Sequence, residues 1–96
     1  MLPGNYFVYI ITNPRKTVLY TGMTNDLPTR LQQHYDNRGN WQTFAGRYHC
    51  YKLLYYQRFS DVQQAIAWEK QIKGMRRSKK EVLINEMNPH WHFLVT

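Results

Sequence analysis

Two tyrosines, Tyr9 and Tyr20, stand eleven residues apart in a segment that could carry proton-transfer chemistry. β-Branched and aromatic residues flank both, and Asn13-Pro14 marks a turn between them, which predicts a β-hairpin. With the turn at residues 13–16, or at 14–15 alone, paired residue numbers sum to 29 and Tyr9 lies directly opposite Tyr20. Cross-strand partners share a face with Cβ atoms about 5 Å apart, so the two phenol hydroxyls converge. The pairing by itself favours a simpler role, an aromatic contact that only stabilises the sheet.

Glu69 interrupts the apolar stripe of a helix predicted between residues 60 and 74. A carboxylate on a core-facing stripe is costly unless it is paired or holds a cation. A single carboxylate suits Mg²⁺, which keeps several waters and takes one or two protein oxygens plus phosphate. The sequence offers no His, Cys and Asp constellation for zinc. Two alternatives to a metal site stay open: a salt bridge to Arg30 or a neighbouring lysine, and a rotation of the stripe toward Trp68 that leaves Glu69 at its margin.

Arg30 and His34 lie four residues apart and therefore neighbour each other on one face of a predicted helix. A guanidinium group matches phosphate bidentately, although an isolated arginine more commonly lies with its stem along an apolar stripe. A solvated histidine is likewise the usual finding on a helix. Taken together, two phenols, an arginine, a histidine and one carboxylate match what phosphodiester hydrolysis needs: a base for water, a cation for the developing charge, and a metal on phosphate oxygen.

The charge of the chain favours a polyanionic partner, nucleic acid above all. Thirteen Lys and Arg residues oppose six Asp and Glu residues, a net charge of +7. Six of the eleven residues from 70 to 80 are basic, and such clustering is a better electrostatic footprint than scattered charge. These residues are Lys70, Lys73, Arg76, Arg77, Lys79 and Lys80.

The elements that must position these residues have the predicted order β-β-α-β-α-α. The first helix is capped by Asn25 or Asp26 and ends near residues 37–39; a loop covers residues 40–49 and a strand buried on both faces covers 51–59. Two further helices begin at Ser60 and Ser78, each with a capping box. The remaining expectations are that Gly74 ends the second helix, that Val82 and Leu83 face inward, and that Trp91 and Phe93 fold back onto the core.

Size and composition predict one small α+β domain spanning residues 1–96, a three-stranded antiparallel sheet flanked by about three helices. Cys50 is the only cysteine, which excludes a disulfide framework. No apolar run approaches the ~20 residues that a membrane span needs, and the N-terminus does not resemble a signal peptide. We therefore expect a cytoplasmic protein without a membrane partner.

Val8-Tyr9 and Tyr20-Thr21-Gly22, followed by Arg30 and Glu69, resemble the GIY-YIG nuclease domain. The resemblance is strongest to small stand-alone bacterial members, relatives of the nuclease domain in the excision-repair protein that makes the first incision. It covers nearly the whole chain and includes residues 20–27, Arg30-Leu31 with His34, and residues 69–73. The resemblance implies a small antiparallel sheet of three strands with flanking helices.

The resemblance also implies roles for matched residues. Tyr9 and Tyr20 match the tyrosines of the two half-motifs, and Gly22 matches the second glycine, where backbone must approach closely. Arg30 matches the arginine that contacts the scissile phosphate. Glu69 matches the single metal-binding glutamate, which implies Mg²⁺ or Mn²⁺ as cofactor.

Other positions are matched more loosely or depart from the motif. His34 occupies a site where some members carry a catalytic histidine and others a tyrosine, and Asn88 corresponds to a late polar active-site residue of some members. Phe7 replaces the glycine of the first half-motif, and Thr21 replaces an isoleucine. Met23 stands where several members have a lysine that could help to depress a phenol pKa. A free phenol with a pKa of ~10 is a poor base at neutral pH, so Arg30, the metal or His34 must assist.

Three functional hypotheses follow. The first is a divalent-metal-dependent DNA endonuclease with a place in DNA repair or recombination, in which the segment 70–80 grips the DNA backbone without reading sequence. In it, Tyr9 or Tyr20 deprotonates water and His34 can assist, and the choice of general base among these three residues stays open. The second is a nucleic-acid-binding module that kept the fold without turnover. The third is a protein-interaction domain that uses the aromatic residues between 41 and 48.

Overall fold

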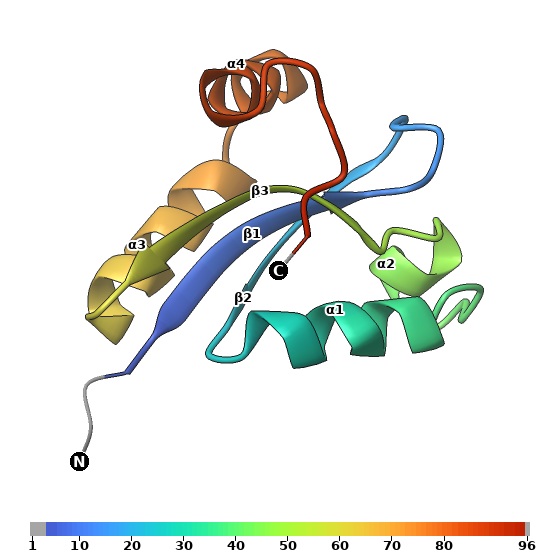
Figure 1. The fold of residues 1–96 in the computed structure, drawn as a ribbon, viewed down its shortest axis with the longest axis horizontal. Coiled ribbons are helices and arrows are strands. Elements are labelled where there is room, and N and C mark those ends of the chain that lie inside the picture. Colours follow the sequence, from blue (N-terminus) through green and yellow to red (C-terminus); the bar gives the residue numbers. More distant parts are fainter. Residues whose placement is uncertain (1–3, 96) are drawn as a thin grey trace.

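The computed structural model describes residues 4–95 as a three-stranded antiparallel sheet covered by helices on both faces (Figure 1). The strand order is β2-β1-β3, so the first strand lies in the middle. This confirms the α+β class and the three-stranded sheet. The elements are β1 (Tyr6–Thr12), β2 (Leu19–Thr24), α1 (Leu27–Asp36), α2 (Phe44–Arg47), β3 (Lys52–Phe59), α3 (Val62–Lys73) and α4 (Arg77–Met87).

The hairpin is present, but its predicted register is wrong by two residues. Paired residue numbers sum to 31, so Tyr9 lies opposite Gly22, and Tyr20 lies opposite Ile11. The loop is longer than a tight turn because the Asn13 side chain organises it: its Oδ1 accepts hydrogen bonds from the backbone amides of residues 17 and 18, at 2.9 and 3.0 Å. A slip by two residues preserves the alternation of side chains along a strand. Both tyrosines therefore still point to the same face.

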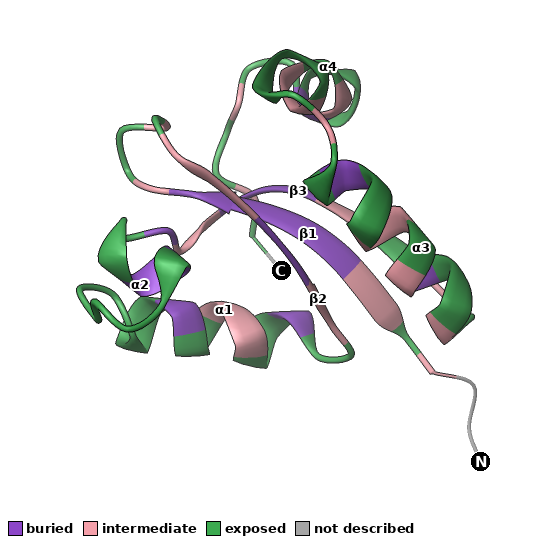
Figure 2. Cartoon of the chain, turned by 180° about the vertical axis from the view of Figure 1, so that it is seen from behind, coloured by how far each residue is buried: buried purple, intermediate pink, exposed green. Residues whose placement is uncertain are grey.

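Two separate apolar clusters pack against the two faces of the sheet. Ile10 and Leu54 meet Ala65 and Ile72 of α3 on one face. On the other face, Tyr9 meets Leu27 of α1. The central strand β1 is accordingly buried from residue 8 to residue 12, and the helices are buried mainly where they meet the sheet (Figure 2). Helices α1 and α2 therefore cover the Tyr9 face, whereas α3 and α4 cover the opposite face.

Helix α2 was not predicted, because the segment 40–49 reads as a loop. Its four residues are capped at the N-terminus by Thr43, whose hydroxyl accepts a hydrogen bond from the Gly46 amide at 3.0 Å. Gly46 leaves no room for a side chain, because a Cβ there would lie 2.6 Å from the Asn40 carbonyl oxygen. A helix of one turn has no periodicity to detect, so only its capping threonine could have indicated it.

The helix boundaries confirm some expectations and correct others. Asp26 caps α1 and Gly74 ends α3, as predicted. Asp61, not Ser60, caps α3, because its side chain accepts from the Gln63 amide at 3.1 Å. Helix α4 begins before Ser78, with Arg76 at its N-cap and no side-chain cap.

The inward-facing side of α4 was predicted only in part. Ile84 is fully buried, whereas Val82 has 57% of its surface exposed and was wrongly expected to face inward. Leu83 packs at the edge of the core cluster. The short apolar run from 82 to 84 does not say by itself which of its members faces the sheet.

Asn88 ties the C-terminal tail to β3. Its Nδ2 donates to the Leu54 carbonyl at 3.0 Å and to the His92 carbonyl at 2.7 Å, and its Oδ1 accepts from the His92 amide at 3.0 Å. Leu54 is skipped in the pairing of β3 with β1, a β-bulge that frees its carbonyl. These bonds give Asn88 a structural role, and the active-site role that the resemblance suggested stays a prediction.

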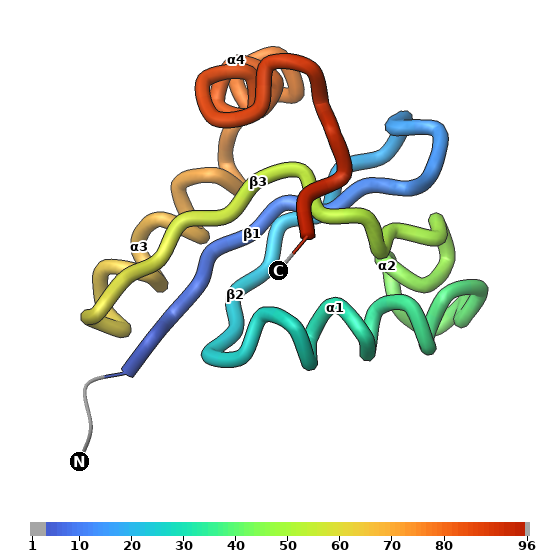
Figure 3. The backbone as a smooth tube through the Cα atoms, viewed as in Figure 1, coloured from blue at the N-terminus to red at the C-terminus, as the bar shows by residue number. Residues whose placement is uncertain are grey.

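The tail beyond Asn88 folds back as expected only in part. It runs from α4 to the start of β3 (Figure 3), where the Leu94 amide donates to the Leu53 carbonyl at 2.8 Å. Trp91 packs against the core, whereas Phe93 stays 38% exposed beneath the ammonium groups of two lysines. Strand β3 is buried on both faces only at residues 53–55, because Gln57 and Arg58 are exposed.

Candidate active site

Tyr9 is the buried centre of a polar cluster on the α1 face of the sheet. Only 1% of its surface is exposed, and its hydroxyl reaches across the backbone of Gly22 on the neighbouring strand. A Cβ at position 22 would overlap the hydroxyl oxygen of Tyr9 and would lie 2.5 Å from its Cζ. The close backbone approach expected at Gly22 is thus the passage of the phenol over β2.

Helix α1 supplies two partners for this phenol. His34 Nε2 lies 2.8 Å from the Tyr9 hydroxyl oxygen, and Arg30 Nε donates to the same oxygen at 3.4 Å. The four-residue spacing places both side chains one turn apart on the helix, as predicted. His34 is not a solvated helix histidine, because only 6% of its surface is exposed.

Burial is the largest cause of the pKa shifts of Tyr9 and His34 in this cluster. It raises the pKa of Tyr9 to about 12, against the opposing hydrogen bond and positive charge of Arg30. Burial, together with the Arg30 charge, lowers the pKa of His34 to about 4. The hydrogen bond to Tyr9 raises the pKa of Arg30. At neutral pH the cluster is therefore a neutral phenol between a neutral imidazole and a permanent cation.

Tyr20 approaches the same histidine from the next strand. Its ring lies 5.5 Å from the His34 ring, edge to face, and the Tyr9 ring lies 5.7 Å from it. Tyr20, Arg30 and His34 line a recess of about 160 Å³. The two tyrosine rings, predicted to share a face, thus both lie edge to face against the ring of His34.

The recess also contains residues that the sequence did not indicate. Asn37, Thr43, Phe44 and Ala45 complete its lining. They come from the end of α1 and from α2, and the capping pattern of Thr43 was the one available signal. The Phe44 ring stacks on the Tyr20 ring at 6.2 Å with an interplanar angle of 25°.

Glu69 comes from α3, on the other side of the sheet. Its side chain is 20% exposed, and its Oε2 pairs with Lys73 Nζ at 3.3 Å, the salt bridge to a neighbouring lysine that was one of the alternatives. The Glu69 charge acts on Tyr9, since it contributes to the raised pKa of that phenol. Within residues 4–95, no group of three or more His, Cys, Asp and Glu side chains could hold a metal.

The basic segment 70–80 is mostly exposed, but its residues are not equivalent. The guanidinium of Arg77 is already bound within the protein. It pairs with Glu81 at 3.0 Å and donates to the carbonyls of Thr17 and Lys16 at 2.7 and 3.3 Å. It fastens α4 to the hairpin loop. The predicted patch is completed by Lys70, Arg76, Lys79 and Lys80, of which only Lys80 is half-buried, and by Lys73 beside Glu69.

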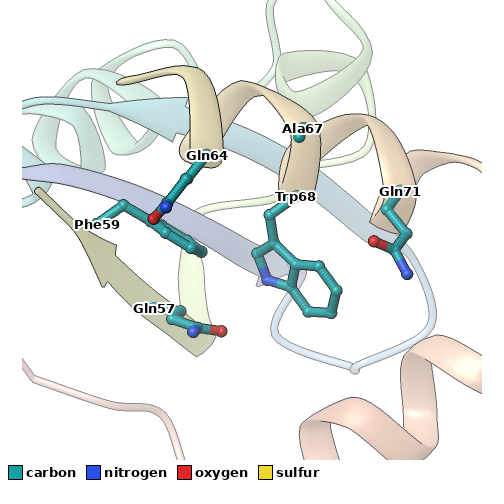
Figure 4. Close-up of a pocket in the computed structure, with 6 residues that line it drawn as sticks. All are labelled: Gln57, Phe59, Gln64, Ala67, Trp68 and Gln71. Atoms are coloured by element: carbon teal, nitrogen blue, oxygen red, sulfur yellow. The ribbon is translucent and has the colours of Figure 1, made fainter. Parts of the chain in front are cut away.

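A second hollow, of about 360 Å³, lies between β3 and α3 (Figure 4). Its walls are the side chains of Gln57 and Phe59 from the strand and of Gln64, Ala67, Trp68 and Gln71 from the helix. The Trp68 indole donates to the Tyr55 hydroxyl at 3.0 Å, and that hydroxyl donates to the Gln57 Oε1 at 2.9 Å. This hollow holds no ionisable side chain and none of the residues predicted to do chemistry.

Comparison with known proteins agrees with this geometry. Residues 5–82 match the family model described as the GIY-YIG catalytic domain. The chain belongs to the GIY-YIG family. The domain is that of an endonuclease superfamily, for which DNA is the implied substrate. No helix within residues 4–95 is long and apolar enough to cross a membrane.

Within the GIY-YIG family, the relatives are small proteins of similar length. The chain is 33% identical over 86 residues to the UPF0213 protein YazA of Bacillus subtilis, which covers 90% of this chain and 84% of YazA. It is 38% identical over 79 residues to a UPF0213 protein of Oceanobacillus iheyensis, covering 82% and 88%. The solution structure of a UPF0213 protein from Bacillus halodurans superposes with a TM-score of 0.57 at 30% identity, covering 91% of this chain and 89% of that one.

Proposed function

We propose that this GIY-YIG protein is a divalent-metal-dependent endonuclease that hydrolyses phosphodiester bonds of DNA and serves DNA repair or recombination. The observation that carries the proposal is the chain Arg30–Tyr9–His34. A buried phenol that contacts both a cation and a neutral base has the parts that proton transfer beside a phosphate requires.

The proton moves along this chain. Because Tyr9 accepts a hydrogen bond from Arg30, its own hydroxyl hydrogen is free to point to His34 Nε2. A neutral His34 protonated at Nδ1 accepts it. The attacking water then gives a proton to the Tyr9 oxygen as that oxygen passes its own proton to His34, so no free phenolate is needed. The relay thus avoids a phenolate of Tyr9, whose pKa is raised to about 12, and places the proton on His34, a weak base whose pKa is about 4.

Arg30 serves the phosphate as well as the phenol. Its Nε faces Tyr9, and its Nη1 donates to the Gln33 side chain at 3.1 Å. Its guanidinium lines the recess with Tyr20. A phosphate in the recess would therefore meet a fixed positive charge, which offsets the charge that develops on the phosphoryl oxygens.

Glu69 is the residue that would hold the metal. A single part-exposed carboxylate, with no group of three metal ligands elsewhere in residues 4–95, fits Mg²⁺ or Mn²⁺ held mainly by waters and phosphate, and does not fit zinc. When bound, the ion supplies charge neutralisation at the phosphate. The ion would compete there with the ammonium group of Lys73, which pairs with one of the two carboxylate oxygens of Glu69 and is itself 53% exposed.

The experiment is nicking of supercoiled plasmid and of branched DNA with Mg²⁺ or Mn²⁺. We expect Glu69→Gln, Arg30→Ala and Tyr9→Phe each to lower the rate by about 10²-fold or more. Two exposed side chains provide matched controls: Glu86→Gln and Arg15→Ala should cut like the wild type.

Two results would count against the proposal. Undiminished cutting by Glu69→Gln and Arg30→Ala would refute the assigned site. Salt-sensitive binding of DNA by the wild type, with no cleavage in either metal, would instead make the protein a binding module.

A further inference from the structure

Three large aromatic side chains project from α2 and its flanks into solvent. Trp41 is 72% exposed, Phe44 50% and Tyr48 42%. Exposed aromatic groups clustered in this way mark an interaction surface, because burying them elsewhere would have been favourable. Trp41, Phe44 and Tyr48 are called the aromatic platform below.

The aromatic platform is held by the backbone beneath it. The Cys50 amide donates to the Ala45 carbonyl, and the Gly39 amide donates to the Gly46 carbonyl, both at 2.8 Å. The rings of Phe44 and Tyr48 contact each other at 4.8 Å. A surface ordered before binding loses little conformational entropy when a partner arrives.

The aromatic platform is continuous with the proposed active site. Phe44 stacks on Tyr20, and both residues line the recess together with Arg30 and His34. A strand whose phosphate lies at Arg30 would therefore pass its next bases over Phe44 toward Tyr48 and Trp41.

The charge around the aromatic platform suits a polyanion. No Asp or Glu occurs between residues 37 and 60, a stretch that contains Arg38 and, between Phe44 and Tyr48, Arg47. The Arg47 guanidinium lies 5.5 Å from the Trp41 ring centre, and its Nη2 donates to the Trp41 carbonyl at 3.0 Å. Aromatic rings interleaved with arginines are the pattern by which proteins hold nucleic-acid strands whose bases are unpaired.

We propose that the aromatic platform stacks unpaired bases beside the scissile phosphate, so that the substrate is DNA that is single-stranded where it is cut. The bases of an intact duplex stack on each other and leave no face for Trp41 or Tyr48. This inference rests on the proposed function, because it names the substrate of the same site.

The first test measures binding without cleavage. A labelled oligonucleotide, single-stranded or annealed to its complement, is titrated in EDTA and followed by fluorescence anisotropy. The wild type should bind the single strand more tightly. Trp41→Ala should raise the single-strand Kd by about tenfold, with duplex binding changed less than about twofold. Val82→Ala removes a similarly exposed apolar side chain on α4 and should leave both Kd values unchanged.

Conservative variants separate stacking from general apolar contact. Trp41→Phe keeps a ring and should restore most of the single-strand affinity, whereas Trp41→Leu should not. Equal single-strand and duplex affinities of the wild type, or a Trp41→Leu variant that binds like the wild type, would overturn the proposal. Absence of binding to either form would also overturn it and would assign the aromatic platform to a protein partner.

The second test locates the cut. A duplex with a single-stranded gap is treated with Mg²⁺, and the products are mapped. Cuts within the gap support the proposal, and cuts spread over the paired arms contradict it. Because the binding test needs no metal, the single-strand preference can fail while plasmid nicking succeeds, and the reverse is also distinguishable.

Discussion

The burial of His34 predicts how the stability of the protein depends on pH. Its pKa falls from the ordinary 6.5 to about 4 on folding, because the buried ring loses its hydration and lies near Arg30. Between these values the unfolded chain binds a proton that the folded chain does not, so the free energy of unfolding decreases as the pH falls. Each pKa unit is worth about 1.4 kcal/mol. The loss is about 1 kcal/mol at pH 6, about 2 at pH 5 and about 3 at pH 4.

Urea unfolding of the wild type and of His34→Gln at pH 7, 6, 5 and 4 measures this loss. The glutamine can keep one hydrogen bond to Tyr9 but has no proton to gain. We expect the variant to be less stable at pH 7 and the difference to shrink by about 3 kcal/mol by pH 4. Changes from other acidic and basic groups cancel in that difference.

An exposed histidine on the tail supplies the control for this experiment. His90→Gln should give a curve parallel to that of the wild type. If the wild type and His34→Gln instead run parallel from pH 7 to pH 4, His34 is not buried as a neutral base. The proton relay through Tyr9 would then lose its acceptor.

Three other substitutions test single contacts. Gly22→Ala should displace the Tyr9 phenol, lowering the free energy of unfolding by about 1–3 kcal/mol and abolishing plasmid nicking; wild-type nicking would contradict the packing described. Thr21→Val should raise that free energy by about 1 kcal/mol, because the buried Thr21 hydroxyl has no hydrogen-bond partner within the described residues; a decrease in urea unfolding would refute this. Asn88→Ala should lower it by about 2–4 kcal/mol and speed hydrogen exchange at the Leu94 amide, and unchanged exchange would show that the tail is held by other contacts.

The sequence correctly predicted which residues share a face, because side chains alternate along every strand and recur with every turn of a helix. Tyr9 and Tyr20 remained on one face although the register was wrong by two residues, since a shift by an even number preserves the side. Arg30 and His34 met Tyr9 because a helix turn brings them together. The length of the hairpin loop was missed because it depends on the Asn13 side chain bonding to two amides.

What the sequence did not reveal depends on contacts between distant segments. The salt bridge of Glu69 to Lys73 joins neighbouring turns of one helix and was among the alternatives that the sequence allowed, whereas the effect of Glu69 on Tyr9 follows only from how α3 lies behind the sheet. The four-residue α2 is stable because Ala45 packs on the core and Thr43 caps it. Ser60 and Asp61 are both good caps, and only the structure shows which one is used.

The hydrogen bonds from the C-terminal tail to β3 affect whether this protein associates with other molecules through its sheet edge. Strand β3 lies at one edge of the sheet, where a free row of backbone N–H and C=O groups would template pairing with a strand of another molecule. The tail occupies that edge at Leu53, and Asn88 occupies the carbonyl that the bulge at Leu54 releases. The same few residues that complete the fold therefore also protect it against edge-to-edge aggregation.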